Sequence, residues 1–181
     1  VVSDNYGGAR QAVEHLLALG HRRIGFIVSN LEHETIQGRW AGVKDAMLCA
    51  GIKIDPDLVY TEGDELPATG YEGAEFILEH KNPPTAIFAF NDMMALGVLR
   101  YAQQHKIDVP KDLSVVGFDD MLLASYSTPS LTTILQPKYE LGQKAARLLL
   151  RRLRGDESQF VRMTLPTKLI VRESTAPPPA R

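Results

Sequence analysis

The feature of this sequence that most restricts its fold is a series of short apolar runs, each followed by a segment of helical periodicity. Residues 24–28, 86–90 and 113–118 are apolar at nearly every position instead of alternating between apolar and polar side chains. Strands of this kind are buried on both faces, as in a parallel sheet with helices on both sides. The sequence therefore predicts an α/β fold with a doubly wound parallel sheet flanked by helices.

The same pattern predicts the order of strands and helices along the chain. Asp4-Asn5 should cap a first helix that Gly20 ends, and Val1-Val2 reads as the last part of a preceding strand. The other expected helices are residues 35–50, 69–80, 93–105 and 138–154, and the other expected strands are residues 24–28, 58–60, 86–90, 113–118 and 167–171.

Composition indicates a folded chain and argues against several functions. The 181 residues, 44% of them hydrophobic and 23% charged, suffice for one core or a lobe and a half. A net charge of -2, with no basic run interleaved with aromatic residues, argues against direct DNA binding. No apolar stretch reaches the roughly 18 to 20 residues of a membrane span. Cys49 is the only cysteine, so no disulfide can form within the chain, and its apolar helical context predicts a place in the core.

Polar side chains follow three of the expected strands. They are Thr35 and Arg39, then Asn91-Asp92, then Asp119-Asp120. Ligands of open parallel sheets bind beyond the carboxyl ends of the strands, so these groups should converge on one cleft. A guanidinium fork, a carboxylate and an amide together match the vicinal diol of a sugar or the edge of a purine.

Each of these groups also has a simpler interpretation as a structural residue. Asp92 is expected to cap the helix that opens at Met93, whereas for Asn91 capping and binding stay open. For Asp119 the interpretation as a ligand-binding residue is favoured, because Asp120 is free to cap the following segment instead. Arg39 taken alone is typical of a solvated helix position.

Catalysis is the competing interpretation, and few residues support it. Asp119-Asp120 is the only carboxylate pair at a strand end, and neighbours on one loop usually diverge. There is no Gly-x-Ser-x-Gly, no phosphate-binding glycine loop after a strand and no histidine spacing typical of metal sites. We therefore predict no catalytic residue, no metal ligand and no cofactor.

Several motifs, in their order along the chain, resemble the LacI/GalR family of transcriptional regulators. Val-Gly-Phe-Asp-Asp ends at Asp120, Pro-x-Leu-Thr-Thr ends at Thr133, and Leu-Pro begins at Leu165. The matching segments are residues 20–24, 39–42, 84–97, 109–110, 113–120, 129–137 and 165–174. Sugar-binding proteins of import systems share the Asn-Asp segment, but the ordered set is more specific to the regulators. The similarity covers nearly the whole chain.

This resemblance implies a lobe of the type I periplasmic binding protein-like fold, in which an effector is held between two lobes. It places Arg39, Asn91 and Asp119, together with Thr35, at effector-contacting positions, and Gln136 at the crossing to the other lobe. Glu65 stands where many members have an aromatic that stacks on the ligand. The loss of that stacking face favours an effector more polar than a simple pyranose, such as one that carries an amine.

The resemblance also implies a division of the chain. Residues 1–135 should form the second, effector-binding lobe, residues 136–162 a crossover helix that belongs to the first lobe, residues 163–175 the return strands and residues 176–181 a disordered tail. The helix-turn-helix and most of the first lobe are expected to be missing. The apolar stripe of residues 138–154 should then be exposed, move onto the second lobe or pair with another copy.

The function implied is that of a small-molecule-sensing domain in a cytoplasmic regulator that controls DNA binding by its parent protein. The effector is expected to be sugar-like or nucleoside-like, and operator DNA would be contacted only through the missing N-terminal domain. A homodimer through residues 69–80 and 95–105 is expected, with no contact with a membrane. The alternatives are a solute-binding protein of a sugar importer and, less favoured, an α/β enzyme.

Overall fold

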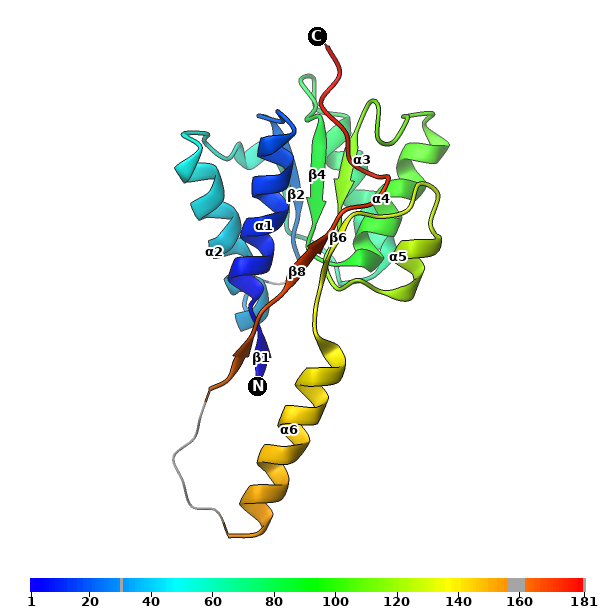
Figure 1. The fold of residues 1–181 in the computed structure, drawn as a ribbon. Helices are drawn as coiled ribbons and strands as arrows, with labels where there is room; N and C mark the ends of the chain where they lie inside the picture. The colour runs from blue at the N-terminus through cyan, green and yellow to red at the C-terminus, as the bar shows by residue number, and fades with distance from the viewer. Residues whose placement is uncertain (30, 156–161, 181) are drawn as a thin grey trace.

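The computed structural model describes residues 1–29, 31–155 and 162–180. Its main sheet is parallel, with strand order β3-β2-β4-β5. The strands are β2 (Ile24–Ile27), β3 (Val59–Tyr60), β4 (Ala86–Ala89) and β5 (Ser114–Val116). The flanking helices are α1 (Asn5–Ala18), α2 (Glu34–Cys49), α3 (Pro67–Leu78) and α4 (Asp92–Gln104). Figure 1 shows the sheet between these helices, which confirms the predicted parallel sheet with flanking helices.

The strands form where the sequence is apolar throughout because both faces of the sheet are covered. Every residue of β2, β4 and β5 is buried. Phe26 pairs with Phe88 in register, and Trp40 of α2 meets the ring of Phe26 edge-on at 5.7 Å between centroids. The expected strand at residues 58–60 is shorter, since a 3-10 turn, η1 (Pro56–Leu58), takes its first residue.

The helices pack in two pairs, α1 against α2 and α3 against α4. Small residues let each pair approach closely. A Cβ built on Gly97 would lie 2.0 Å from the carbonyl oxygen of Pro67, and one on Gly42 would lie 2.2 Å from that of Tyr6. These glycines therefore set the distance between backbones at both helix crossings.

The order of the strands indicates which end of the sheet is expected to bind a ligand. After β2 the chain moves outward to β3, then returns past β2 to β4 and continues to β5. This change of direction between β2 and β4 is where ligands bind in open α/β sheets. Both strands end at that point, where α2 carries Arg39 and Asn91 is the N-cap of α4.

A second, short sheet extends the main one. Strands β6 (Thr133–Leu135) and β8 (Lys168–Ile170) are antiparallel, and single bridges join Val116 to Thr132 and Asp119 to Leu135. Between β5 and β6 lies the short helix α5 (Leu122–Tyr126). The prediction of a strand near residues 167–171 is confirmed by β8.

The segment expected to be a disordered tail begins at Ala176, which contacts the sheet. The main-chain nitrogen of Ala176 donates to the Ser114 hydroxyl at 3.0 Å, and its carbonyl oxygen lies 2.9 Å from Nε2 of the buried His21. The ring nitrogens of His21 also lie within hydrogen-bonding distance of the Thr85 and Ser114 hydroxyls. The side chain of His21 therefore fixes the start of the tail to the sheet, and Arg181 lies outside the described residues.

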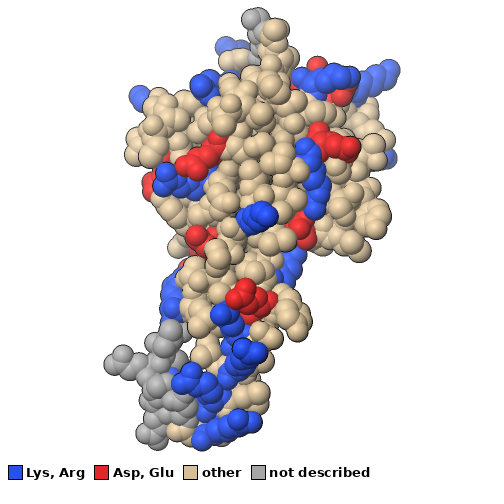
Figure 2. All heavy atoms as spheres, viewed as in Figure 1, with Lys and Arg blue, Asp and Glu red and all other residues tan. Residues whose placement is uncertain are grey.

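Two features extend away from the sheet, as Figure 1 shows. Strand β1 (Val2–Ser3) pairs in parallel with β7 (Thr164–Leu165), a strand that the sequence pattern did not predict. Helix α6 (Lys138–Leu153) follows β6 and has no buried residue, so its apolar stripe is exposed, the first of the three outcomes expected for it. Figure 2 shows basic side chains gathered over its far end. Part of the expected crossover segment, residues 156–161, lies outside the described residues.

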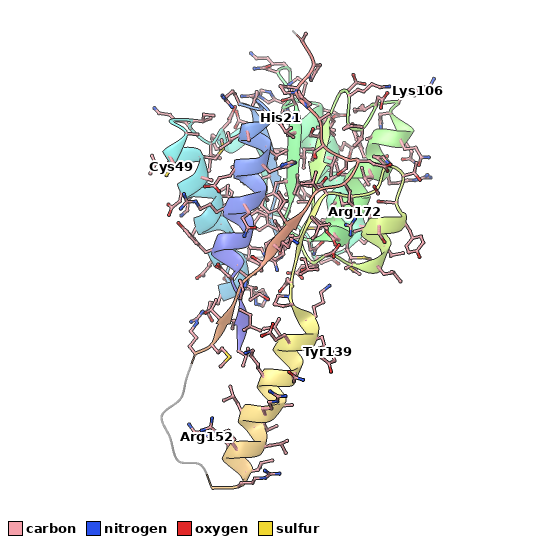
Figure 3. All side chains as sticks on the ribbon, in the orientation of Figure 1. His21, Cys49, Lys106, Tyr139, Arg152 and Arg172 are labelled. Carbon is pink, nitrogen blue, oxygen red and sulfur yellow. The ribbon has the colours of Figure 1, made fainter. Side chains whose placement is uncertain are left out.

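Cys49 corrects another expectation. It is the last residue of α2 and is exposed rather than packed in the core (Figure 3). No helix within the described residues is long and apolar enough to cross a membrane.

Candidate functional site

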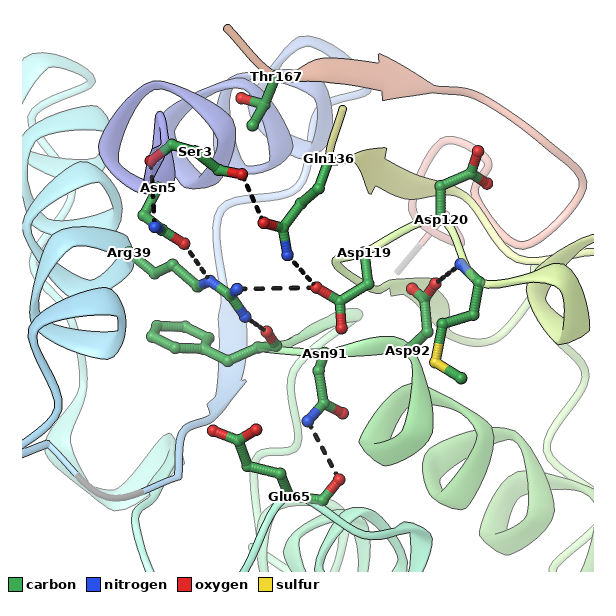
Figure 4. Close-up of polar contacts among 12 residues, drawn as sticks. Ser3, Asn5, Arg39, Glu65, Asn91, Asp92, Asp119, Asp120, Gln136 and Thr167 are labelled. Carbon is green, nitrogen blue, oxygen red and sulfur yellow. Dashed lines mark hydrogen bonds and ion pairs between the residues drawn. The ribbon is translucent and has the colours of Figure 1, made fainter. Parts of the chain in front are cut away.

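Arg39 lies at the centre of the polar cluster beyond the strand ends (Figure 4). Its side chain is buried, its Nε donates to the Asn5 carboxamide oxygen at 2.9 Å, and its Nη1 donates to the carbonyl oxygen of Phe90. The guanidinium also stacks on the ring of Phe118, 3.8 Å from the centroid. Burial lowers the pKa of Arg39, while the carboxylates of Asp119, Glu65 and Asp92 act in the opposite direction. The reading of Arg39 as a solvated helix residue does not fit this position.

Asp119 faces Arg39 from the end of β5. Its Oδ1 lies 3.7 Å from Arg39 Nη2 and also accepts a hydrogen bond from Gln136 Nε2. The Gln136 carboxamide oxygen in turn accepts from the Ser3 hydroxyl at 2.6 Å. Burial raises the pKa of Asp119, and the charge of Arg39, followed by the Gln136 hydrogen bond, opposes that rise. Arg39, Asp119 and Gln136 thus form one connected cluster.

Asn91, and not the expected Asp92, is the residue that caps helix α4. Asn91 is the N-cap of α4, accepting from the Met94 main-chain nitrogen at 2.7 Å, and its Nδ2 donates to the Glu65 carbonyl oxygen at 3.1 Å. Asp92 is fully buried and accepts from the Met121 main-chain nitrogen at 2.7 Å and from the Thr133 hydroxyl. The prediction that Asp92 caps the helix is therefore wrong.

The environment of Asp92 perturbs its ionisation. Burial is the main cause that raises its pKa to about 6, and the charges of Asp119 and Asp120 act in the same direction. The hydrogen bonds from Thr133 and Met121 oppose this rise. Asp120 does not cap a helix either, because its carboxylate pairs with Arg172 at 2.6 Å. The two adjacent carboxylates, Asp119 and Asp120, thus bind different partners, as expected for neighbours on one loop.

Thr35 and Glu65 lie apart from the Arg39–Asp119 pair. Thr35 is exposed and lines a cavity of about 220 Å³ with Asn5, Glu34 and Gly38. Glu65 is exposed, its carboxylate accepts from the Ser29 hydroxyl at 3.1 Å, and it lines a cavity of about 290 Å³ with Ser29 and His33. The carbonyl oxygen of Glu65 accepts a hydrogen bond from Asn91 Nδ2, and the charge of its carboxylate acts on both Arg39 and Asp119.

Three residues of the cluster were missed at the level of sequence, namely Ser3, Asn5 and Phe118. The signal for the first two is present in the sequence, because Ser3 and Asn5 follow the strand end at Val1-Val2 just as the other polar groups follow their strands. Asn5 holds Arg39, and Asp4 makes the cap bond to the Gly7 nitrogen. Phe118 looked like an ordinary core residue, and its contact with Arg39 depends on tertiary packing.

The arrangement offers donors and acceptors at fixed positions rather than a reactive group. Within residues 1–29, 31–155 and 162–180, no group of three or more His, Cys, Asp or Glu side chains could hold a metal ion. The polar atoms beyond the strand ends are a guanidinium, carboxylates and amides, which suit a neutral ligand rich in hydroxyl or amide groups.

Comparison with known proteins places this site in context. A family model described as a periplasmic binding protein-like domain matches residues 13–175. The HTH-type transcriptional regulator DegA of Bacillus subtilis (strain 168) is 40% identical over 177 residues, which cover 98% of this chain and 52% of DegA. The HTH-type transcriptional repressor PurR of Escherichia coli O1:K1 / APEC is 39% identical over 181 residues, all of this chain and 53% of PurR. The chain spans about half the length of these curated relatives.

Solved structures agree with this result. A transcriptional regulator CelR–cellobiose complex has a TM-score of 0.90 at 37% identity, covering 96% of this chain and 54% of that one. A LacI family transcriptional regulator from Enterococcus faecium with bound ribose has a TM-score of 0.88 at 33% identity, covering 97% of this chain and 64% of that one.

Proposed function

The chain belongs to the periplasmic binding protein-like domain family, its relatives are LacI-family transcriptional regulators, and on that premise we propose that it is the effector-sensing part of such a regulator. The observation that carries this proposal is the pairing of the buried Arg39 with the partly buried Asp119 at the strand ends, supported by Gln136. A charged pair held in this position by main-chain and side-chain bonds is preorganised for ligand recognition. Asn91 extends the same edge toward Glu65.

The proposed effector is a sugar-like or nucleoside-like molecule. Arg39 and Asp119 together supply donors and acceptors for adjacent hydroxyl groups. Relatives have been solved with cellobiose and with ribose, which supports a polyol. Glu65 in place of a stacking aromatic favours a more polar ligand than a simple pyranose. Thr35, on the far side of Asn5, would contact a larger effector that reaches the cavity beside β1.

The proposal includes the remaining parts of a regulator's mechanism. The effector would change DNA binding by the parent protein in the cytoplasm, through a separate DNA-binding domain, without chemical conversion of the ligand. We also propose a homodimer through α3 and α4, where a groove of about 350 Å³ is lined by Tyr71, Leu96 and neighbouring residues. Sedimentation velocity tests the dimer: wild type should sediment as a dimer and Leu96→Glu as a monomer. A wild-type protein that sediments as a monomer at every concentration contradicts the proposal.

A ligand-binding experiment tests the sensing role directly. We would measure the melting temperature of this chain with D-ribose, cellobiose, D-glucosamine, adenosine and guanosine at about 10 mM, or near saturation for the less soluble nucleosides. For a Kd of about 1 mM, ligand at tenfold excess stabilises by about 1.4 kcal/mol, which raises the melting temperature of a chain this size by about 3 to 6 °C. Mass spectrometry of the recovered ligand would detect any turnover, which would contradict the non-enzymatic role.

Variants decide whether the cluster is the binding site. Arg39→Ala with Asp119→Ala should abolish the ligand-induced shift, because both halves of the donor and acceptor pair are lost. The matched control is Arg23→Ala, which breaks an ion pair of 2.7 Å with Asp55 at the opposite, amino-terminal end of β2. If the shift persists in the double variant, the binding site lies elsewhere. If it is lost equally in the control, the effect is one of stability.

A further inference from the structure

The turn that carries Asp119 is held in an unusual conformation. Asp119 and Asp120 have φ of +119° and +49°, values that side-chain-bearing residues rarely adopt. Such a conformation persists only where surrounding contacts fix it. Asp119 must nevertheless point at Arg39 and Gln136, so the contacts that fix this turn also determine where the carboxylate lies.

Asp92 bonds to both ends of that turn. Its main-chain nitrogen donates to the Phe118 carbonyl oxygen at 2.8 Å, on the residue before Asp119. Its Oδ2 accepts from the Met121 main-chain nitrogen at 2.7 Å, on the residue after Asp120 (Figure 4). Its Oδ1 accepts from the Thr133 hydroxyl on β6. One buried residue therefore bonds to both ends of the 118–121 turn and ties it to the neighbouring strand.

The surroundings of Asp92 make room for this contact. A Cβ built on Gly117 would lie 2.3 Å from Asp92 Oδ1, so only glycine at that position allows the carboxylate to reach Thr133. Asp92 itself is fully buried, and its carboxylate oxygens bond to Met121 and Thr133 rather than to Arg39, Gln136 or Asn91. Its bonds serve the turn and not a ligand.

We propose that Asp92 is a positioning residue for effector binding, which acts by holding the 118–121 turn so that Asp119 faces Arg39. The proposal rests on the proposed function, because it assigns Asp119 to the effector site. It attributes to Asp92 no contact with the ligand. It predicts that the geometry of the turn, and not the charge of Asp92, is what matters.

Two substitutions of Asp92 separate geometry from charge. In Asp92→Asn, the amide oxygen can still accept from the Met121 nitrogen while the amide donates to Thr133, whose hydroxyl can accept as well as donate. In Asp92→Ala both side-chain bonds are lost and the Met121 nitrogen is left buried without that partner. A third variant, Gly117→Ala, keeps Asp92 but displaces its carboxylate, so it tests the same contact if Asp92→Ala fails to fold.

The first measurement needs no ligand. The pKa of the Asp119 carboxyl would be followed by carbon NMR in each variant. Asp92→Asn and Asp92→Ala both remove the neighbouring charge, so a difference between them reports the position of Asp119. We expect the Asp119 pKa to fall further toward its ordinary value in Asp92→Ala and in Gly117→Ala, because a released turn exposes Asp119 to water. Equal values in Asp92→Asn and Asp92→Ala would overturn the proposal.

The second measurement uses D-ribose and cellobiose as probes. We expect the Kd to stay within about threefold of wild type in Asp92→Asn and to weaken at least about tenfold in Asp92→Ala and Gly117→Ala. Val13→Ala, a core change in α1 remote from the turn, is the control for lost stability and should leave the Kd unchanged. If neither probe binds wild type, that result counts against the proposed function for these sugars, and the Asp119 pKa still decides the role of Asp92.

Discussion

Replacing Gly97 by alanine should destabilise the protein, although alanine is the better helix former. Gly97 lies in α4 where that helix crosses α3. A Cβ there would lie 2.0 Å from the Pro67 carbonyl oxygen, 2.8 Å from the Tyr71 nitrogen and 3.0 Å from the Gly70 carbonyl carbon. All three neighbours are main-chain atoms, so no side-chain rotation can relieve the overlap, and the two helices must move apart.

The size of the effect follows from these distances. Ordinary contact begins near 3.4 Å, so the Pro67 oxygen must retreat by roughly 1 to 2 Å. Overpacking of this kind costs about 1 to 3 kcal/mol, and rigid main-chain neighbours place Gly97 at the upper end. The gain in helix propensity offsets about 1 kcal/mol. We therefore expect a net loss of about 2 kcal/mol, or a melting temperature lower by about 4 to 8 °C.

Urea denaturation followed by circular dichroism would measure the change. The matched control is Gly142→Ala in the exposed helix α6, where a Cβ meets nothing within 4 Å. The free energy of unfolding of this control should rise by about 1 kcal/mol, because alanine has the higher helix propensity, to the extent that α6 unfolds with the rest of the chain. The two alanine substitutions should thus differ in sign, and Gly97→Ala as stable as wild type would refute the reasoning.

Three further predictions concern ionisation and exposure. Because the pKa of Asp92 is raised to about 6, the native state binds more protons than the unfolded chain between pH 4 and 6. As the pH rises from 4 to 6, the free energy of unfolding of wild type should therefore fall by about 2 to 3 kcal/mol relative to that of Asp92→Asn. A difference between the two proteins that stays constant with pH in urea titrations would contradict this. Burial lowers the pKa of His21, so its contribution to the free energy of unfolding should be present above pH 6.5 and decline as the pH falls below that value. In His21→Ala this pH dependence should disappear, and the chain at Ala176 should become open to proteolysis. Cys49 is exposed, so a maleimide should label it fully in the folded protein, and labelling only after denaturation would show it to be buried.

The fold was predictable because its signals are local. Runs such as residues 86–90 are apolar throughout, and the helices between them begin and end at recognisable residues. Cys49 was misplaced because the apolar pattern of α2 does not specify which residue of the last turn faces outward. Strand β7 lies within residues 163–175, which the family resemblance gave as return strands, but periodicity could not locate it because two residues carry no pattern and its partner, β1, lies at the other end of the chain.

The sequence predicted that the polar groups of the candidate site lie together, but not their detailed contacts. Strand-end reasoning found Arg39 and Asp119, and the structure brings them within 3.7 Å. Adjacent Asn91 and Asp92 are both good capping residues, so sequence could not decide which one caps α4 and which one turns inward to Met121. Asp120 pairs with Arg172, a residue 52 positions later, and only the folded chain brings these two together.

Gln136 gives the cluster a mechanical property. Its carboxamide joins Asp119 at one end to Ser3 at the other, and α6 begins only two residues further along the chain. Ser3 belongs to β1, which pairs with β7, so a single planar side chain links the end of the main sheet to two segments that leave it. A rotation of α6 or a shift of β1 therefore moves the hydrogen-bonding groups of Gln136, and through them the Asp119 carboxylate.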